Sequence, residues 1–488
     1  MSTTAADLAL KTDLFIDGQF VPSETGKRFA TVNPATGETL AEVAEAGQAD
    51  LDRAVAGARK AFESGPWAAM KPRQRGRILT RAAELLLSRA DAFGRGETLD
   101  NGKPIFESAK IDMPAAAECL AYFGESADKL YGDTHPGRTD AFLMTIREPV
   151  GVVGAITPWN FPLLQAMWKI APALALGNAV VLKPASVTPL TALMFGELLA
   201  EAGLPPGAFQ VVPGPGPVVG KAMAEHPGID KISFTGETET GKAILRSAAG
   251  TVKRVSMELG GKSPNIVFAD ADLDAAAKGA INAIFYGKGE LCSAGSRLLV
   301  QESIHDALME KVVERAKKMA PGDPLDPKTR LGALVSEKQR DTVAGYVAKG
   351  ESEGARLVAG GKRAAVNGKG AFFEATVFDG VRPEMTIARE EIFGPVLATL
   401  TFKDDDDAVA IGNSTIYGLA AAVWSRDVKK AIRAAKALKA GTVWINAYNL
   451  YDPGLPFGGY KESGFGRERG HYALEEYSQV KSIWVDLT

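Results

Sequence analysis

The sequence is poor in cysteine, with only Cys119 and Cys292 among its 488 residues. Two cysteines exclude a framework of disulfides, and nothing in their wide separation indicates that they pair. Histidine is also scarce, and the four residues of this type are His135, His226, His305 and His471. None of them lies near Cys292 in sequence, which disfavours a thiol hydrolase that activates its cysteine with an adjacent histidine.

Long runs of one charge are missing as well. The chain has 56 basic and 59 acidic residues and a net charge of −3. No long basic run interrupts this balance, so we expect neither nucleic acid nor an anionic membrane as a partner. The longest charged run, Asp404–Asp407, precedes the apolar positions Val409 and Ile411. We interpret it as the start of a helix rather than as a metal site, and we expect no metal.

Apolar runs of about 18 residues, the length that crosses a membrane, are absent too. The segment Met1–Lys11 has no apolar core preceded by positive charge and does not resemble a secretory signal. These absences favour a protein of the reducing cytoplasm.

What the sequence does contain is a repeated alternation of strand and helix patterns. At roughly 150 residues per domain, a chain of 488 residues is too long for a single compact unit. Within Gly151–Leu259, short β-branched runs such as Val152–Ile156 alternate with helical segments, and a second alternation covers Asn265–Ile445. Continuous apolar strands between helices are typical of parallel sheets built from βαβ units, so we predict an α/β protein.

Two loops follow predicted strands and open helices, as phosphate-binding loops do. The first is Gly214–Gly220 and the second is Phe234–Gly241. Glycines let backbone N–H groups approach a phosphate at a helix N-terminus, but the first loop lacks the GxGxxG spacing, and a turn built for packing explains it equally well. Two such loops in neighbouring βα units favour a nucleotide site more than either does alone. Lys183 ends another predicted strand, where parallel sheets form their ligand crevice. Taken alone, it also fits a solvated lysine.

Cys292 lies among small residues that allow close approach of a substrate, although a lone cysteine is more often inert and buried. Glu258 ends an apolar strand before Gly260 and Gly261. A carboxylate there can have a raised pKa and act as a base, but such a residue is more often a helix cap or part of a salt bridge.

Six motifs in a fixed order favour the functional interpretation of these residues over the structural one. Together they closely resemble the aldehyde dehydrogenase superfamily over about residues 13–485. The motifs are Trp159–Pro162, Leu182–Ala185, Glu258–Lys262, Phe285–Arg297, Glu390–Pro395 and Pro456–Lys461.

The resemblance implies a two-domain α/β fold with a mostly parallel sheet in each domain. The cofactor-binding domain would comprise residues 1–126 and 150–260, and the catalytic domain residues 261–470. Residues 127–149 and 471–488 would form a small β ribbon for oligomerisation, as a homodimer or a homotetramer.

The resemblance also implies the chemistry of an NAD(P)-dependent oxidation of an aldehyde to a carboxylic acid. Cys292 would attack the carbonyl and form a thiohemiacetal, while Asn160 and the Cys292 backbone N–H stabilise the oxyanion. Hydride transfer would leave a thioester, which water activated by Glu258 hydrolyses. Members that transfer the acyl group to coenzyme A generally lack this glutamate. Lys169 and Glu468 match positions associated with proton relay.

The positions that match cofactor contacts in the family predict NAD or NADP as the cofactor. They are Ile156, Trp159, Lys183, Ser186, Gly216, Gly220, Phe234, Thr235, Gly236, Glu237, Leu259, Glu391 and Phe393. Ser186 stands where NAD-preferring relatives commonly carry a glutamate that repels a 2′-phosphate, so NADP should be more tolerable here. Glu237 replaces a common serine at the pyrophosphate. Gly287 and Glu290 replace asparagine and glutamine before the cysteine.

The expected substrate entrance is mostly aromatic and apolar. Its residues are Phe161, Leu164, Gln165, Trp168, Tyr286, Leu291, Tyr451 and Phe457. This lining suits an aliphatic or arylalkyl aldehyde, although each residue is also compatible with plain core packing. A betaine-type aldehyde held by Trp168 and Tyr451 ranks second. The segment Asn446–Gly454 loosely resembles phenylacetaldehyde-type members. A thiol esterase and a non-catalytic relative are the competing classes, and both predict no reduction of NAD or NADP by aldehyde.

Overall fold

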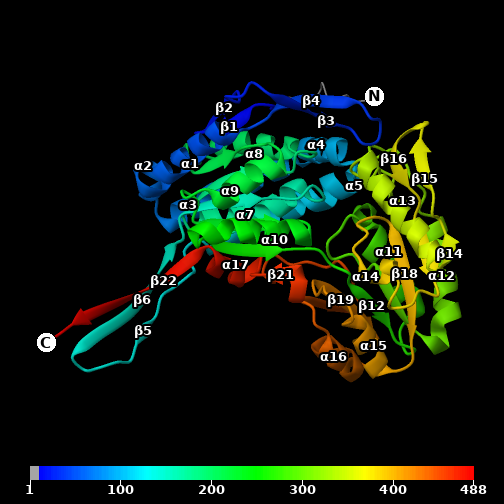
Figure 1. Cartoon of the computed structure of the whole chain (residues 1–488). Coiled ribbons are helices and arrows are strands. Elements are labelled where there is room, and N and C mark those ends of the chain that lie inside the picture. The colour runs from blue at the N-terminus through cyan, green and yellow to red at the C-terminus, as the bar shows by residue number, and fades with distance from the viewer. Residues whose placement is uncertain (1–9) are drawn as a thin grey trace.

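The computed structural model describes residues 10–488, so most of the segment Met1–Lys11 lies outside the described residues. Two α/β bodies and a projecting β ribbon make up the molecule (Figure 1). In Figure 1 the first body lies at the upper left, the second at the right, and the ribbon at the lower left. Each body is built on one large sheet with helices packed against it.

The first body is built on an eight-stranded sheet of order β2-β1-β9-β8-β7-β10-β11-β21. Its strands are β1 Leu14–Ile16, β2 Gln19–Val21, β7 Val152–Ile156, β8 Ala179–Lys183, β9 Phe209–Val211, β10 Lys231–Thr235, β11 Arg254–Glu258 and β21 Gly464–Phe465. The strands from β9 to β11 are parallel, and β7, β8, β9 and β10 are buried along their whole length. The continuous apolar sequence of β7, and that of β8 up to Lys183, result from cover on both faces.

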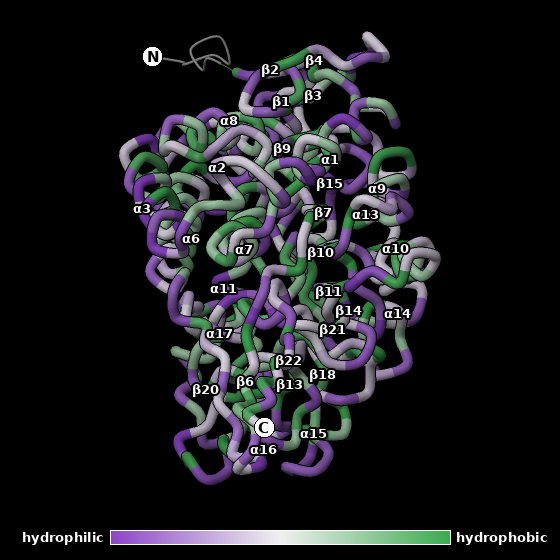
Figure 2. The backbone as a smooth tube through the Cα atoms, turned by 90° about the vertical axis from the view of Figure 1, so that its left-hand side faces the viewer, coloured by the Kyte–Doolittle hydropathy of each residue, from purple (hydrophilic) through white to green (hydrophobic). Residues whose placement is uncertain are grey.

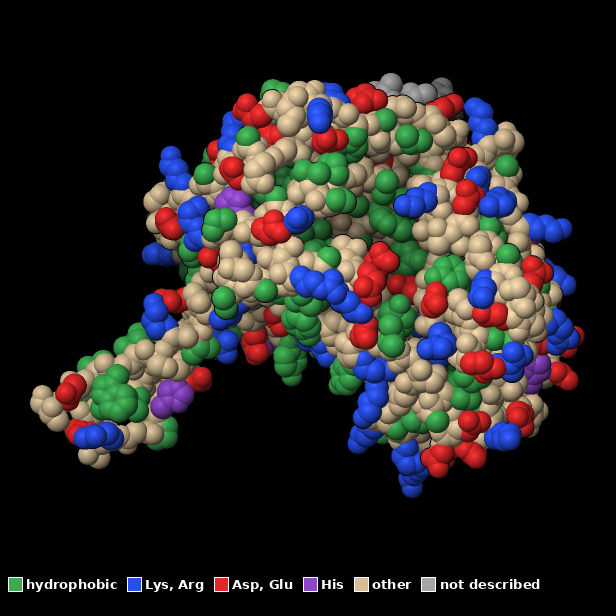
Figure 3. Space-filling view, viewed as in Figure 1, with side chains coloured by type: hydrophobic (Ala, Val, Ile, Leu, Met, Phe, Trp, Pro, Cys, Tyr) green, Lys and Arg blue, Asp and Glu red, His purple; other side chains and the backbone are tan. Residues whose placement is uncertain are grey.

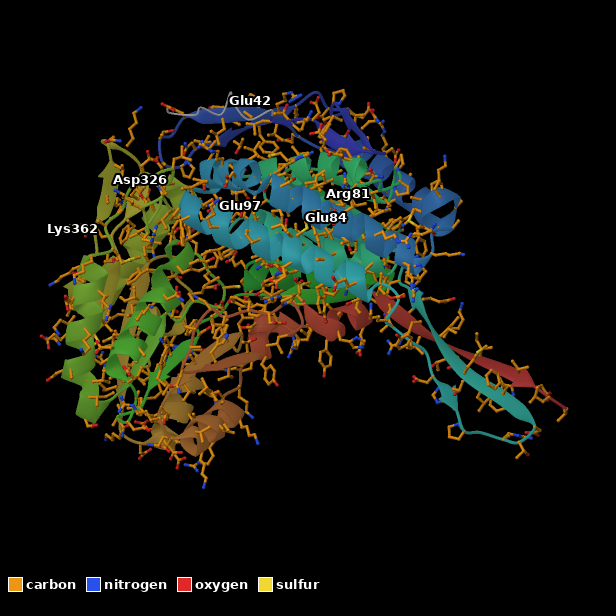
Figure 4. The ribbon with its side chains drawn as sticks, turned by 180° about the vertical axis from the view of Figure 1, so that it is seen from behind. Glu42, Arg81, Glu84, Glu97, Asp326 and Lys362 are labelled. Carbon is orange, nitrogen blue, oxygen red and sulfur yellow. The ribbon has the colours of Figure 1, made fainter. Side chains whose placement is uncertain are left out.

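Alternate residues of this sheet enter two different cores. Val180 and Leu182 of β8 pack into one core, and Ala179 and Val181 into the other, because successive side chains of a strand point to opposite faces. The helices of the first body are α1 Gln48–Glu63, α2 Gly65–Ala68, α3 Pro72–Ser88, α4 Ala90–Asn101, α5 Ile105–Glu107, α6 Met113–Ser126, α7 Pro162–Ala175, α8 Leu190–Glu201, α9 Lys221–Glu225 and α10 Thr238–Ala248. Figure 4 shows the helical layer from behind, with Arg81 and Glu84 on α3 and Glu97 on α4.

The second body contains a seven-stranded sheet of order β14-β17-β18-β13-β12-β19-β20, in which only β14 runs antiparallel to its neighbour. Its strands are β12 Pro264–Val267, β13 Arg297–Gln301, β14 Arg356–Ala359, β17 Thr376–Asp379, β18 Val396–Phe402, β19 Ala420–Trp424 and β20 Thr442–Ile445. Its helices are α11 Leu273–Phe285, α12 His305–Lys317, α13 Glu337–Ser352, α14 Thr386–Arg389, α15 Asp405–Gly412 and α16 Val428–Ala437.

The acidic run is a helix start, as predicted. Asp404 is the N-cap of α15, and its side chain accepts a hydrogen bond of 3.0 Å from the Asp407 backbone N–H. Three further aspartates occupy the first turn, where the helix dipole favours negative charge.

The ribbon is a three-stranded antiparallel sheet of β5 Thr134–His135, β6 Ala141–Pro149 and β22 Ser478–Asp486. β22 pairs with β6 from Ser478 opposite Pro149 to Asp486 opposite Ala141. The ribbon projects from the rest of the chain in Figure 1, and it points toward the viewer in Figure 2. It carries large exposed apolar side chains, among them Trp484 at 62% exposure, and hydrophobic atoms are visible on it in Figure 3.

The last part of the chain returns to the first body. β21 pairs with β11, and α17 (Gly470–Glu476) contacts α7 and packs Leu474 into the core of the first body. The predicted catalytic domain, residues 261–470, includes β21, yet β21 joins the sheet of the first body. This pairing is with a strand some 200 positions earlier, and no local sequence pattern encodes it. The division into domains stays a prediction, while the predicted α/β class is confirmed.

Within residues 10–488, no helix combines the length and apolarity required to cross a membrane. The same described part of the chain contains no group of three or more His, Cys, Asp or Glu residues arranged to hold a metal ion.

Candidate active site

Five of the predicted site residues form a row along one edge of the first sheet. Ile156 pairs in register with Lys183 on one side and with Phe234 on the other, and Thr235 pairs with Glu258. These are the carboxyl ends of four parallel strands. The strand order reverses between β7 and β10, because the chain moves to β8 and β9 on one side before it returns to β10 and β11 on the other. In doubly wound sheets, ligands bind outside the carboxyl ends at such a reversal.

Cys292 reaches this edge from the second body, on the segment between η5 (Tyr286–Gly289) and β13. A Cβ on Gly261 would collide with the Cys292 carbonyl, so a glycine is required where the backbone after β11 passes the cysteine loop. The Cys292 side chain is buried. Burial and the facing Glu258 carboxylate raise the pKa of the Cys292 thiol well above its usual range, so the thiol is protonated in the resting site.

Glu258 ends β11 and is almost fully buried. Burial raises the pKa of its carboxyl to about 7, and the like charge of Glu468 adds to the rise. Lys169, Cys292 and Thr235 oppose it and lower the pKa. Neither carboxylate oxygen has a well-formed hydrogen bond to a described residue. A carboxyl with a pKa near neutrality and free oxygens is suited to exchange protons with a ligand or a water.

Lys169 links Glu258 to Glu468. The Lys169 ammonium is buried on α7, donates a hydrogen bond of 2.7 Å to the Thr235 hydroxyl, and forms an ion pair with Glu468. Thr235 is itself in contact with Glu258. The Ser233 hydroxyl donates to Glu468 over 3.4 Å. The three predicted residues Glu258, Lys169 and Glu468 therefore belong to one buried polar chain.

Asn160 lies in the loop before α7 and is buried next to the cysteine segment. Its Nδ2 donates one hydrogen bond of 2.9 Å to the carbonyl of Glu290, which leaves the second Nδ2–H without an acceptor among the described residues. The Cys292 backbone N–H likewise has no acceptor in the described part of the chain. Two unused donors thus accompany the thiol.

The predicted cofactor residues surround the edge of the first sheet. A Cβ at Gly220 would lie 3.7 Å from Lys183 Cδ and 3.9 Å from Ile156 Cδ1, while one at Gly216 would meet nothing within 4 Å. The Lys183 ammonium is buried and donates 2.7 Å to the Pro184 carbonyl, and the Ser186 hydroxyl donates 2.9 Å to the Gly214 carbonyl.

Other predicted cofactor positions come from the loops that face this edge. Trp159 packs edge-on against Phe393, with ring centroids 5.1 Å apart. The Glu391 carboxylate accepts 2.9 Å from the Gly261 backbone N–H, and burial raises its pKa to about 8. Glu237 is exposed at the N-cap of α10 and caps it with no side-chain hydrogen bond. A Cβ at Gly236 would lie only 2.6 Å from Cζ of the Phe234 ring, and the Leu259 backbone N–H donates 3.0 Å to the Ser463 carbonyl.

A cavity of about 590 Å³ reaches Cys292, and none of the predicted cofactor residues lines it. All eight predicted substrate residues line it, namely Phe161, Leu164, Gln165, Trp168, Tyr286, Leu291, Tyr451 and Phe457. Residues spaced three and four apart on α7 share one face of the helix, which explains why three of them point into the same space. The Tyr451 hydroxyl lies 2.8 Å from the Ser293 hydroxyl and fixes the wall beside the cysteine.

The sequence missed several residues of this cavity. Phe106, Glu107, Ile111 and Asp112 come from the α5–α6 region, and Lys278, Ile281 and Asn282 from α11. Arg330 and Arg469 also line it. The helical spacing of Lys278, Ile281 and Asn282 was a signal, but nothing in the local sequence identifies Arg469.

Gly287 and Glu290, which replace the asparagine and glutamine that are common in the family, belong to a charged network beneath the cysteine loop. The Lys288 ammonium is buried 2.7 Å from the Glu290 carboxylate and donates 2.8 Å to the Asn101 carbonyl. Glu290 also accepts 3.0 Å from the Val335 backbone N–H. Gly287 and Lys288 both have left-handed backbone conformations, with φ of 58° and 64°. The cysteine loop is therefore held by an internal ion pair.

The comparisons with known proteins agree with this geometry. The chain matches the aldehyde dehydrogenase family over residues 20–483. It therefore belongs to that family, and the resemblance seen in the six motifs is confirmed. It is 48% identical to human mitochondrial aldehyde dehydrogenase over 97% of this chain and 91% of that protein. It is 47% identical to human retinal dehydrogenase 2 over 98% of this chain and 92% of that protein.

Solved structures place the fold in the same family. An indole-3-acetaldehyde dehydrogenase in complex with NAD+ superimposes with a TM-score of 0.98 at 48% identity, covering 99% of this chain and 98% of that one. The NAD+ complex of an aldehyde dehydrogenase from Bacillus cereus gives 0.97 at 46% identity, with 99% and 98% covered. The two-sheet aldehyde dehydrogenase fold is confirmed.

Proposed function

We propose that this member of the family oxidises an aliphatic or arylalkyl aldehyde to the carboxylic acid with NAD+ or NADP+, through a thioester on Cys292. The observation that carries the proposal is the position of the thiol at the inner end of an apolar cavity, facing Glu258 and flanked by two unused N–H donors. Relatives that act on indole-3-acetaldehyde and retinal support a bulky apolar substrate.

Cys292 is the nucleophile in this proposal. Its raised pKa requires a base, and Glu258 is the facing carboxylate that takes the thiol proton as the sulfur attacks the aldehyde carbon. The second Asn160 Nδ2–H and the Cys292 backbone N–H then donate to the oxyanion of the thiohemiacetal. Loss of one such donor in other enzymes raises the barrier by roughly 3–4 kcal/mol.

The residues at the sheet edge fit a dinucleotide. The glycines at 216 and 220 leave a cradle bounded by Lys183 and Ile156, at the carboxyl ends where such ligands bind. Lys183 and Ser186 would face the adenosine ribose, and Glu391 and Phe393 would hold the nicotinamide ribose. When bound, NAD+ or NADP+ supplies the hydride acceptor for the oxidation. Two solved relatives with a bound NAD+ match this chain over 99% of its length.

Glu258 completes the reaction by activating water for attack on the thioester. Its pKa of about 7 lets it accept a proton from water and release that proton afterwards. Lys169 and Glu468 form an ion pair in the buried polar chain. They are positioning residues that set the charge around Glu258.

The cavity favours an apolar aldehyde over a betaine-type one. Trp168 and Tyr451, the two rings considered for a cationic substrate, already flank the Arg469 guanidinium, each with its centroid 5.3 Å away. A second cation placed between the same rings would be repelled by Arg469. A histidine-dependent thiol esterase is also disfavoured, because no histidine is among the described residues that line the cavity.

We propose a homodimer or a homotetramer, as the family resemblance implies. The exposed apolar side chains of the ribbon, including Phe142 and Trp484, support this assembly, because such patches on soluble proteins mark interaction sites.

The direct test is an aldehyde panel assayed with NAD+ and NADP+ separately. Aldehyde-dependent reduction of either cofactor is expected, and it should disappear in Cys292→Ala while cofactor binding remains. Cys119→Ala, which removes the other buried thiol, is the matched control and should retain turnover. Ester hydrolysis without any cofactor reduction would overturn the proposal in favour of a thiol esterase.

A further inference from the structure

Arg469 presents a buried guanidinium to the substrate cavity without a hydrogen-bonding partner. The residue is only 7% exposed and lines the cavity together with Cys292. No described residue accepts a hydrogen bond from its side chain or forms an ion pair with it, and its Nε is a buried donor without a partner. Buried arginines are normally paired, so this group has binding capacity that the protein itself does not use.

The walls around Arg469 hold it in place without neutralising it. Its guanidinium lies 5.3 Å from the centroids of Trp168 and of Tyr451. Tyr451 and Trp168 also contact Phe457, with ring centroids 5.8 Å and 5.3 Å apart. The guanidinium is therefore fixed by aromatic faces, while its N–H edge has no acceptor.

The backbone at Arg469 has an unusual conformation. Its φ and ψ are 64° and 165°, a region that glycine occupies and other residues rarely do. The neighbouring Glu468 is held by two backbone hydrogen bonds of 2.7 Å with Phe457, and the Gly470 N–H donates 2.8 Å to the Pro453 carbonyl. These contacts hold the unfavourable backbone that directs Arg469 into the cavity while Glu468 meets Lys169.

The charges around the cavity are positive on balance. Arg469, Arg330 and Lys278 line it as cations. The acidic lining residues are Glu107, whose pKa burial raises to about 8, and Asp112, which is paired with Lys103 at 2.6 Å. Outside the cavity, Glu118 and Asp452 act on Arg469 only at longer range, and neither forms an ion pair with it. An anionic ligand would therefore be attracted along the entrance.

We propose that Arg469 binds a carboxylate at the far end of the substrate, so that the preferred substrate is an aldehyde that also carries a carboxylate. The inference rests on the proposed function and names its substrate class. The apolar walls would hold the chain or ring between the two ends, with the aldehyde at Cys292 and the carboxylate on the guanidinium edge. Arginine is suited to this role because its parallel N–H groups match the two oxygens of a carboxylate.

The test compares matched aldehydes with and without the carboxylate. Hexanal and adipic semialdehyde have the same chain length. Shorter and longer pairs of the same kind show which separation between aldehyde and carboxylate fits best. In the unmodified protein, kcat/KM is expected to favour the carboxylated member of at least one pair by about tenfold or more, an advantage that weakens at high salt. If no pair shows this preference while the neutral aldehydes are oxidised, the carboxylate site is wrong and the proposed function stands. If neither class is oxidised, the proposed function itself fails.

Variants separate recognition from packing. Arg469→Gln should lower the ratio of kcat/KM for the carboxylated over the neutral aldehyde about tenfold or more, mainly through KM. Arg469→Lys, which keeps the charge but not the fork of donors, should restore part of that ratio. Arg426→Gln removes an exposed arginine remote from the cavity lining and should leave the ratio unchanged. Equal losses on both aldehydes in Arg469→Gln would indicate a structural role and overturn the inference. If that variant does not fold, the pairs measured on the unmodified protein decide.

Discussion

Glu258 and Cys292 face each other across the junction of the two bodies. Glu258 ends a strand of the first sheet, and Cys292 precedes a strand of the second. The Glu258 carboxylate raises the pKa of the Cys292 thiol, whereas the thiol lowers the pKa of the Glu258 carboxyl. The reactive pair therefore exists only when both bodies are docked, and the active site reports on their relative position.

The pH dependence of deacylation follows from Glu258. Burial raises the pKa of its carboxyl to about 7, and only the ionised form can accept a proton from water. Where hydrolysis of the thioester limits turnover, kcat should therefore rise as the pH increases through about 7 and fall below it. In Glu258→Gln, the burst of reduced cofactor should form more slowly, because Glu258 also takes the thiol proton, but it should still reach one equivalent and precede a steady state slower by roughly 10²–10⁴-fold. Stopped-flow measurement of the burst checks this, and a normal steady-state rate would refute the role of the base.

The two neighbours of Glu258 should move that pH profile in opposite directions. Glu468 raises the pKa of Glu258 and Lys169 lowers it. Glu468→Gln removes the like charge and frees Lys169, so the midpoint of the kcat profile should shift to lower pH. Lys169→Met removes the attraction and leaves Glu468 unpaired, so the midpoint should shift to higher pH. Shifts of the same sign in both variants would show that the ion pair acts through packing alone.

Ser186 should relax the choice of cofactor. Its hydroxyl donates to the Gly214 carbonyl, and no carboxylate stands at this position beside Lys183. Ser186→Glu should therefore weaken NADP relative to NAD, by about tenfold in the ratio of their dissociation constants, while Ser186→Gln serves as the uncharged control. Equilibrium titration with both cofactors measures the ratio. The idea fails if the ratio is the same in all three proteins.

Lys183 adds a pH dependence to the same choice. Burial lowers the pKa of its ammonium to about 8, so in the free protein the cation is present below this pH and is lost above it. A 2′-phosphate needs that cation, whereas NAD has no such group. The preference for NADP over NAD should thus decrease as the pH is raised through about 8. A ratio independent of pH would mean that Lys183 does not meet the phosphate.

Several residues of this candidate site could be predicted from the sequence because they end predicted strands. Such strands end at Ile156, Lys183 and Glu258, and parallel strands align these ends at one edge. Arg467 and Arg469, by contrast, lie two residues apart in the same glycine-rich turn and behave differently. Arg467 donates to the carbonyls of Gly459 and Gly466, whereas Arg469 enters the cavity. The difference depends on a backbone conformation fixed by distant contacts, which no local pattern encodes.

The Lys288–Glu290 pair gives a prediction about stability. Both side chains are buried, with the ammonium and the carboxylate 2.7 Å apart beneath the cysteine loop. The single variant Lys288→Gln leaves the Glu290 carboxylate buried without its cation, and Glu290→Gln leaves the Lys288 ammonium buried without its anion. Breaking such a pair typically costs about 3–5 kcal/mol of unfolding free energy. The double variant Lys288→Gln with Glu290→Gln removes both charges and keeps polar groups of similar size, so its loss should be much smaller.

Urea unfolding of the two single variants and the double variant closes this cycle. The single variants should also lose turnover beyond their loss of folded protein, because the Glu290 carbonyl accepts the hydrogen bond that orients Asn160. The double variant should regain most of it, since the loop can keep its position without an unpaired charge. If the single and double losses simply add, the two side chains are not coupled, and the cysteine loop is held by its backbone contacts alone.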